Sequence, residues 1–202
     1  MREYDAIAAW YARERASATG VQEVLDVVAG LSRGASVLDL GCGNGIPITR
    51  ALSAAGFTVF GVDSSQEMLL RFRENCPGVA FTCAEIQSCH FGPRLFDAAV
   101  AWGVLFHLPH DDQAAALANV AKALKTGAPF LFTGGDQEGS IDGEPMNGVP
   151  FRYWSFGVDG YRDLLRQQGM ELLSVRKDAG QNIYYLARKA ADAPTPEASP
   201  RG

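Results

Sequence analysis

An aspartate followed by three alternating glycines is the part of this sequence best suited to binding a ligand. Residues 37–45 read VLDLGCGNG, and the apolar residues that open this segment predict a short buried strand. The glycines predict a turn before a helical stretch, and such a turn lets a ligand lie directly against the backbone. Because a carboxylate at Asp39 repels phosphate and attracts positive charge, the segment favours a cationic ligand.

The spacing of the glycines points away from nicotinamide dinucleotides. Gly41, Gly43 and Gly45 follow a G-x-G-x-G pattern, whereas dinucleotide-binding turns follow G-x-G-x-x-G. S-adenosylmethionine is a nucleoside that carries both a sulfonium and an ammonium group. We therefore expect S-adenosylmethionine as the cofactor and S-adenosylhomocysteine as its product.

Two further acids stand where strands are expected to end. Asp63 follows the glycine turn, and its carboxylate can accept hydrogen bonds from ribose hydroxyls; alternatively it only caps the next helix. Glu85 can accept the adenine amino group with Ile86 beside the base, or it is a solvated surface glutamate. Met68 either covers the adenine ring or belongs to the core.

The elements that must position these residues alternate along the chain. Apolar strands that alternate with helices predict an α/β fold, a Rossmann-like sheet with helices on both faces and ligands at the carboxyl ends of its strands. After two opening helices, we expect strands at 36–41, 58–63, 79–84, 96–104, 128–133, 172–177 and 183–188, and helices at 46–55, 65–75, 111–124 and 161–168.

The chain is expected to form a single domain. Residues 1–189 are predicted to make this domain, with an N-terminal helical cap at 1–31 and a lid insertion at 134–157. Residues 190–202 hold three prolines and little apolar content, which predicts a disordered tail.

Six segments of the chain resemble the class I S-adenosylmethionine-dependent methyltransferases, and among them the small-molecule enzymes of the type 11/25-like group. They are YDAIAAWY at 4–11, VLDLGCGNG at 37–45, VFGVDSS at 59–65, AEI at 84–86, FDAAVAWGVLFHLP at 96–109 and ALKTGAPFLFT at 123–133. The resemblance implies methyl transfer and a seven-stranded, mostly parallel sheet whose last strand is antiparallel. Residues 101–104 read AWGV rather than the N-P-P-Y of exocyclic-amine methylases, which disfavours DNA adenine as the target.

The resemblance also distributes roles among the residues of the predicted site. It implies that Asp39 and the glycines lie along the methionine portion, Asp63 on the ribose, and Glu85 and Ile86 at the adenine. Tyr11 is our candidate for a cation–π contact with the sulfonium, although it can equally pack its helix onto the core. The predicted cofactor contacts are Tyr11, Asp39, Gly41, Cys42, Gly43, Gly45, Asp63, Ser64, Met68, Glu85, Ile86 and Trp102.

His107 is the histidine best placed to act as a base on a hydroxyl acceptor. It follows the fourth expected strand, and its alternative role is to pack against the cofactor or hold loop backbone. A metal site built from His107, His110, Asp111 and Asp112 is disfavoured, because Pro109 interrupts the turn and aspartates commonly cap helices. We expect no metal.

The expected lid carries the candidates for substrate binding. Arg152 can meet a substrate carboxylate, and Tyr153 and Trp154 can wall an apolar pocket or simply pin the lid to the core. The leading hypothesis is methylation of a small aromatic or carboxylated metabolite at oxygen or nitrogen by in-line displacement. A nicotinamide-dependent oxidoreductase and a non-catalytic S-adenosylmethionine-binding protein remain the alternatives.

Composition sets limits on partners and location. The net charge of −5 over 202 residues gives no attraction toward nucleic acid or an anionic membrane. Residues 1–15 are charged throughout, so we expect no signal peptide, and the four cysteines form no C-x-x-C pair. We expect a cytoplasmic protein with a small-molecule substrate and no nucleic-acid or membrane partner. The oligomeric state is not predicted.

Overall fold

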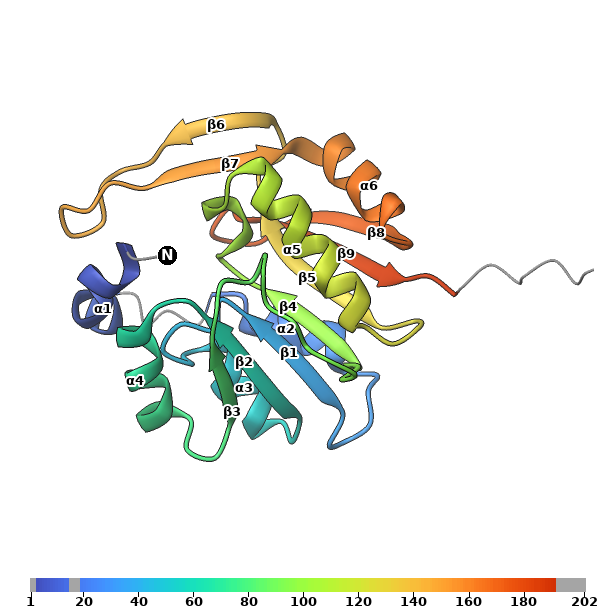
Figure 1. The fold of residues 1–202 in the computed structure, drawn as a ribbon, viewed down its shortest axis with the longest axis horizontal. Coiled ribbons are helices and arrows are strands. Elements are labelled where there is room, and N and C mark those ends of the chain that lie inside the picture. Colours follow the sequence, from blue (N-terminus) through green and yellow to red (C-terminus); the bar gives the residue numbers. More distant parts are fainter. Residues whose placement is uncertain (1–2, 15–18, 192–202) are drawn as a thin grey trace, which may run out of the picture.

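A seven-stranded sheet forms the centre of the protein. The computed structural model describes residues 3–14 and 19–191, and Figure 1 shows its arrangement. The strand order is β3-β2-β1-β4-β5-β9-β8. These strands are β1 (Ser36–Leu40), β2 (Thr58–Asp63), β3 (Ala80–Cys83), β4 (Ala98–Ala101), β5 (Pro129–Gly134), β8 (Met170–Lys177) and β9 (Ile183–Lys189). The first five pair in parallel and β9 is antiparallel to both of its neighbours, which confirms the predicted fold class.

Helices cover both faces of this sheet, because the inner strands are apolar on both sides. One face packs against α5 (His110–Ala123) and α6 (Gly157–Gln167), around Phe130, Phe132 and Tyr161. The other face packs against α2 (Val21–Val28) and α3 (Ile48–Ala54). The remaining helices are α1 (Glu3–Glu14) and α4 (Gln66–Asn75), with one 3-10 turn, η1 (Leu105–His107).

The segment predicted as a lid contains two strands that the sequence analysis did not predict. Strands β6 (Glu138–Asp142) and β7 (Arg152–Phe156) pair in an antiparallel hairpin separate from the main sheet. From the sequence we predicted a lid here without strands, and the burial of β6 gives a reason, because all five of its residues are exposed and show no apolar alternation. Two boundaries differ from the expected ones by more than two residues: the fourth strand ends at Ala101, before a glycine of positive φ (Gly103, +74°), and α6 begins at Gly157.

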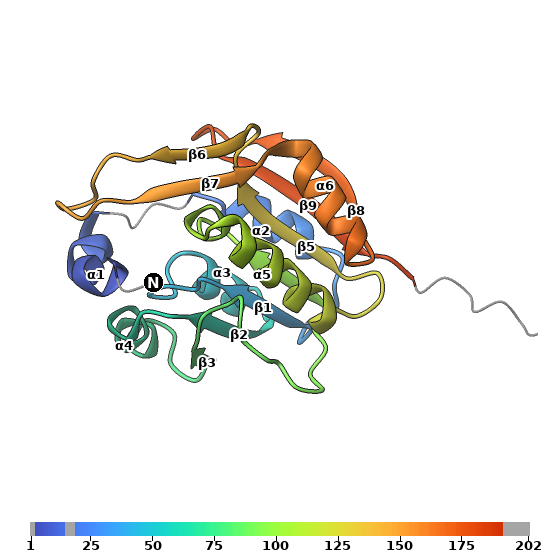
Figure 2. The same cartoon turned by 45° about the horizontal axis from the view of Figure 1, so that its top comes forward.

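Helix α1 and the hairpin meet above the carboxyl ends of the parallel strands. Ile7 of α1 packs with Met146 and Phe151 from the loop between β6 and β7. Asp5 ties α1 to the amino end of α4, since its carboxylate accepts hydrogen bonds from the Ser65 hydroxyl at 2.6 Å and the Glu67 N–H at 3.2 Å. Figure 2 shows α1 and the hairpin together at one edge of the fold. Two segments distant in sequence thus close over the same end of the sheet.

The expected tail at 190–202 lies almost wholly outside the described residues. No helix within residues 3–14 and 19–191 is long and apolar enough to cross a membrane.

Candidate functional site

Two adjoining cavities lie at the carboxyl ends of the parallel strands. The larger has a volume of about 930 Å³ and reaches from the glycine turn to the β6–β7 hairpin and the β8–β9 turn. The smaller, about 70 Å³, lies beside the ends of β2 and β3. Both are lined by Tyr4, Tyr11, Gly41, Gly43, Trp102, Gly103 and His107. The larger cavity is in the size range of small-molecule sites.

The three glycines of the turn after β1 have different functions, although all have positive φ values of 67°, 53° and 81°. A Cβ at Gly41 would lie 2.5 Å from Val104, and one at Gly45 would lie 2.6 Å from the Cys76 sulfur. A Cβ at Gly43 would meet nothing within 4 Å. Gly41 and Gly45 are therefore required by packing against the protein itself, whereas the backbone at Gly43 opens into the cavity.

Asp63 holds this turn in place from the neighbouring strand. One carboxylate oxygen accepts a hydrogen bond from the Gly43 N–H at 2.8 Å, and the other accepts one from the Ser65 N–H at 2.8 Å. Burial raises the pKa of Asp63, and these two N–H donors oppose that rise. Asp63 lines the smaller cavity and also supports the start of α4, so ribose binding stays a prediction beside its helix-capping contact. Each oxygen retains a lone pair for a ligand.

Asp39 lies deeper, at the floor of the larger cavity. It is 3% exposed and accepts a hydrogen bond from the Thr49 hydroxyl. Burial raises the pKa of Asp39 to about 7; the Thr49 hydrogen bond lowers it, and the charge of Asp63 raises it further. A cation bound nearby would return this carboxyl to its charged form.

The residues predicted to hold the nucleoside gather around the smaller cavity. Asp63, Ser64, Met68, Glu85 and Ile86 all line it, from β2, α4 and the loop after β3. Met68 is also part of the core, at 1% exposed. The smaller cavity therefore unites side chains from the β2–α4 connection and from the loop after β3, at the carboxyl edge of the sheet.

Three other predicted cofactor contacts need separate description. Cys42 lines the larger cavity, but its sulfur packs toward Gly61 and burial raises the pKa of its thiol well above the usual value. Gly45 lines neither cavity among the described residues, consistent with its packing role. Trp102 lines both cavities and lies directly over Gly20, where a Cβ would come within 2.2 Å of the indole.

His107 is buried in a cage of aromatic rings. Its Nε2 lies 3.0 Å from the Tyr4 hydroxyl, and its Nδ1 has no hydrogen-bond partner among the described residues. The rings of Phe106, Phe151 and Tyr153 pack at its edges and faces. Burial lowers the pKa of His107 to about 4, so the imidazole is neutral at physiological pH. It can orient a polar group, but it holds a proton weakly.

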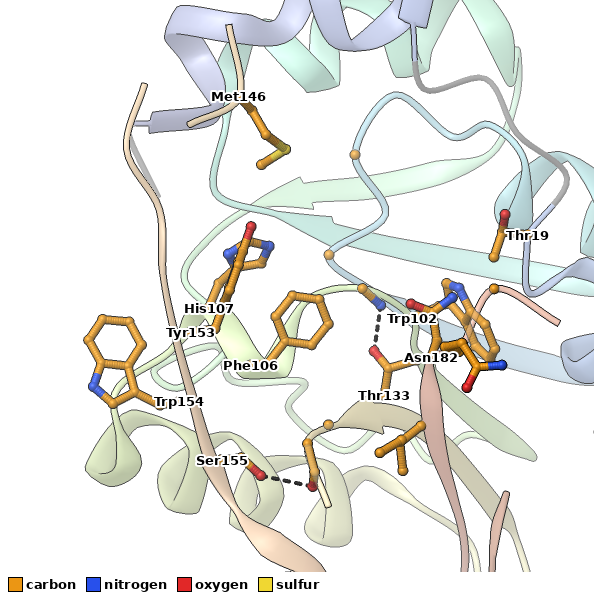
Figure 3. A pocket seen from close by; sticks show the side chains of 18 of the residues that line it. Thr19, Trp102, Phe106, His107, Thr133, Met146, Tyr153, Trp154, Ser155 and Asn182 are labelled. Atoms are coloured by element: carbon orange, nitrogen blue, oxygen red, sulfur yellow. Dashed lines mark hydrogen bonds between the residues drawn. The ribbon is translucent and has the colours of Figure 1, made fainter. Parts of the chain in front are cut away.

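The three lid residues chosen from the sequence separate in the structure. Tyr153 and Trp154 line the larger cavity, and Figure 3 shows Tyr153 beside His107 while the Trp154 ring points away. Arg152 does not line either cavity among the described residues. Its guanidinium donates to the Ser140 hydroxyl at 2.9 Å, lies 3.7 Å from Asp142, and stacks near the Trp154 ring.

Sequence reasoning missed several lining residues. Phe106, Met146 and the pair Gln181–Asn182 all face the larger cavity (Figure 3 labels Phe106, Met146 and Asn182). Only Phe106 had a local signal, since it adjoins His107. Gln181 has a positive φ of 66°, which is uncommon for this residue type, and no sequence rule predicts it.

The arrangement suits a ligand with positive charge and several hydrogen-bond donors. The buried Asp39 and the half-buried Asp63 flank an open stretch of backbone, and a third acidic residue, Glu85, lines the smaller cavity. Within residues 3–14 and 19–191, no three His, Cys, Asp or Glu side chains lie together in a way that would hold a metal ion. His110, once considered with His107 for such a site, instead lies 2.9 Å from the Ser155 carbonyl oxygen.

Comparison with known proteins is consistent with this geometry. Residues 37–127 match the family model described as a methyltransferase domain. An uncharacterized methyltransferase of Bacillus cytotoxicus is 32% identical over 112 residues, which cover 55% of this chain and 51% of that protein. The chain thus spans about half the length of the curated relatives it matches.

Solved structures share the fold at low sequence identity. The CcbJ methyltransferase of Streptomyces caelestis superposes with a TM-score of 0.78 at 21% identity, covering 94% of this chain and 98% of that one. A 1,6-didemethyltoxoflavin-N1-methyltransferase of Burkholderia thailandensis, solved with 1,6-didemethyltoxoflavin and S-adenosylhomocysteine, gives a TM-score of 0.68 at 22% identity, covering 94% and 84%.

Proposed function

We propose that this chain is a class I S-adenosylmethionine-dependent methyltransferase, which transfers a methyl group to an oxygen or nitrogen atom of a small molecule; the match of residues 37–127 to a methyltransferase domain supports this. The observation that carries this proposal is the open backbone at Gly43 between the carboxyl groups of Asp39, which is buried, and Asp63, which is half-buried. A pyrophosphate would be repelled there, whereas a cationic nucleoside is attracted.

The residues present fit this cofactor. Asp63 has lone pairs free for ribose hydroxyls, Glu85 and Ile86 stand where an adenine would be recognised, and Met68 offers an apolar surface. Asp39 lies on the side of the larger cavity, where it would favour the amino-acid end with its positive charges. Tyr11 and Trp102 supply aromatic faces to both cavities, which favours a cationic centre between them.

The protein's part in the reaction is alignment and exclusion of water. When bound, the sulfonium supplies an activated methyl group for in-line displacement. The roof formed by α1 and the β6–β7 hairpin shields the cavity, and the aromatic cage around His107 gives it a rigid apolar wall. His107 does not store a proton, because its imidazole is held neutral, and its place in this proposal is as part of the cavity wall.

Calorimetry with S-adenosylhomocysteine tests the cofactor assignment. We expect binding to the wild-type protein and at least tenfold weaker binding to Asp63→Asn. This substitution removes the negative charge from one of the two carboxyl groups that flank Gly43. Asp97→Asn is the matched control, because Asp97 also accepts a backbone N–H, from Ser36 at 2.8 Å, but does so at the opposite end of β1. Equal affinities for the two variants, or no binding to the wild type, would contradict the proposal.

Activity and the alternatives need separate measurements. Transfer of a labelled methyl group across a metabolite panel tests catalysis, and binding without transfer would favour a non-catalytic S-adenosylmethionine-binding protein. A fluorescence titration with NADH tests the oxidoreductase alternative, for which the G-x-G-x-G turn is unsuited. We further propose that residues 1–189 act as one domain, in which the cap at 1–31 and the lid at 134–157 enclose the acceptor.

A further inference from the structure

The larger cavity has one wall made of aromatic side chains, which we call the ring wall. It consists of Phe106, His107 and Tyr153, with Met146 beside them (Figure 3). The ring centroids of Phe106 and Tyr153 lie 5.4 Å apart, and those of His107 and Tyr153 lie 5.1 Å apart. These rings come from η1 and β7, and Phe106 and Tyr153 are only partly buried. Their uncovered faces suit a planar, apolar ring of a ligand.

The charged groups around this cavity carry one sign. The carboxyl groups of Asp39, Asp136 and Glu138 line it, whereas no lysine or arginine among residues 3–14 and 19–191 does. The Lys177 ammonium lies 3.6 Å from the Asp136 carboxylate, but Lys177 itself does not line the cavity. His107 is neutral. A carboxylate or phosphate group on a methyl acceptor would therefore lose its hydration without gaining an ion pair with a lysine or arginine of the described residues.

The turn between β8 and β9 offers neutral hydrogen-bonding groups to this cavity instead. Gln181 and Asn182 line the cavity from the β8–β9 turn. Asp178, itself 8% exposed, fixes this turn by accepting hydrogen bonds from the Asn182 N–H at 2.8 Å and from its amide nitrogen at 2.7 Å. Gln181 is thereby kept in its left-handed conformation at the cavity mouth. Amides in these positions recognise uncharged polar substituents.

We propose, on the basis of the methyltransferase function above, that the methyl acceptor is a planar ring compound that carries no anionic group. Its ring packs on the ring wall, and its uncharged or basic polar substituents face the amides and carboxylates. The lone pair of a neutral nitrogen or hydroxyl oxygen forms the new bond to the methyl carbon. The carbon–sulfur electron pair stays on sulfur, and any proton on the acceptor atom leaves to water.

Matched fragments test this assignment without knowledge of the natural substrate. Each aromatic ring is offered as a carboxylate, a carboxamide and an aminomethyl derivative to protein saturated with S-adenosylhomocysteine, and affinities are measured by ligand-observed NMR and calorimetry. We expect carboxamide and aminomethyl fragments to bind at least tenfold more tightly than the matched carboxylates. Carboxylates that bind equally well or better, or no cavity-binding fragment at all, would overturn the proposal.

Two variants on the same strand locate the binding. Tyr153→Leu removes a member of the ring wall and should weaken the neutral fragments at least fivefold. Arg152→Gln, whose side chain lies outside the cavity, should change their affinity less than twofold. S-adenosylhomocysteine affinity should remain unchanged in both, so a failure of the cofactor assignment would appear separately. A carboxylate fragment whose binding depends on Arg152 would instead support the sequence-based hypothesis of an anionic substrate.

Discussion

The Asp63 carboxylate accepts a hydrogen bond of 2.8 Å from the Gly43 N–H, so the end of β2 fixes the turn that follows β1. The neighbouring N–H groups of Gly41 and Cys42 are both directed at the Val62 carbonyl, at 2.7 and 3.1 Å. The N–H groups of Gly41, Cys42 and Gly43 are therefore all hydrogen-bonded within the protein. What the turn offers a ligand is space and a nearby negative charge.

This relationship predicts a specific effect of one added methyl group. Gly43→Ala should fold, lose about 1–2 kcal/mol of stability because of the positive φ, and bind S-adenosylhomocysteine at least tenfold more weakly. Gly127→Ala is the control, since Gly127 also has a positive φ (+81°) and open space around it but lines neither cavity. Thermal unfolding and calorimetry measure the two effects. Equal affinities in both variants would show that Gly43 does not contact the ligand.

Asp39 should make the stability of the ligand-free protein depend on pH. Its pKa is raised from 3.8 to about 7, so between these values the folded state holds a proton that the unfolded state has released. Stability conferred by the neutral carboxyl is complete below about pH 4 and is lost as the pH rises through 7, with a span on the order of 4 kcal/mol.

Asp39→Asn isolates this contribution, because the amide oxygen can still accept the Thr49 hydrogen bond. Urea unfolding from pH 4 to 8 should show the variant gaining stability relative to the wild type as the pH rises. His107 acts in the opposite direction, since its lowered pKa reduces stability as the pH falls below about 6.5, but it does so in both proteins. If the difference in unfolding free energy between the wild type and Asp39→Asn stayed constant from pH 4 to 8, the raised pKa of Asp39 would be refuted.

His107 should remain neutral well below the pH at which histidines usually titrate. We expect the ¹⁵N shifts of its ring to stay those of a neutral tautomer at pH 5.5, with protonation only near pH 4. Tyr4→Phe removes the hydroxyl 3.0 Å from Nε2 and should change the tautomer ratio without restoring titration near 6.5. Titration of the wild-type ring near 6.5 would show that the cage admits water.

The hairpin is anchored through a buried glutamine, which gives a test of the lid's attachment. Gln113 is fully buried; its amide nitrogen donates to the Leu108 and Trp154 carbonyls, and its oxygen accepts the Tyr161 hydroxyl at 2.7 Å. Tyr161→Phe should cost about 1–3 kcal/mol in chemical unfolding, because it leaves that oxygen unpaired. Tyr184→Phe is the control, since no hydrogen bond of the Tyr184 hydroxyl is found within the described residues. Similar losses of unfolding free energy in both variants would argue against a stabilising role of the Tyr161–Gln113 hydrogen bond.

Local patterns in the sequence were sufficient to predict the sheet and the gathering of three acidic residues at its carboxyl edge. The alternation of apolar strands and helices predicted the sheet, and the carboxyl edge of a parallel sheet brought Asp39, Asp63 and Glu85 together. Asp39 is the penultimate residue of β1, Asp63 ends β2 and Glu85 lies two residues after β3, so chain position alone placed them near the carboxyl edge.

Tertiary contacts decided which residues of the β6–β7 hairpin and of the loop after β4 line the larger cavity. Whether Arg152 or Tyr153 faces the cavity depends on which side of β7 turns inward, and the apolar periodicity of a five-residue edge hairpin is too weak to specify that. The Tyr4–His107 contact joins residues 103 positions apart, and no local rule encodes such a distance. Burial then set the chemistry of His107, because desolvation, rather than its residue type or spacing, lowers its pKa.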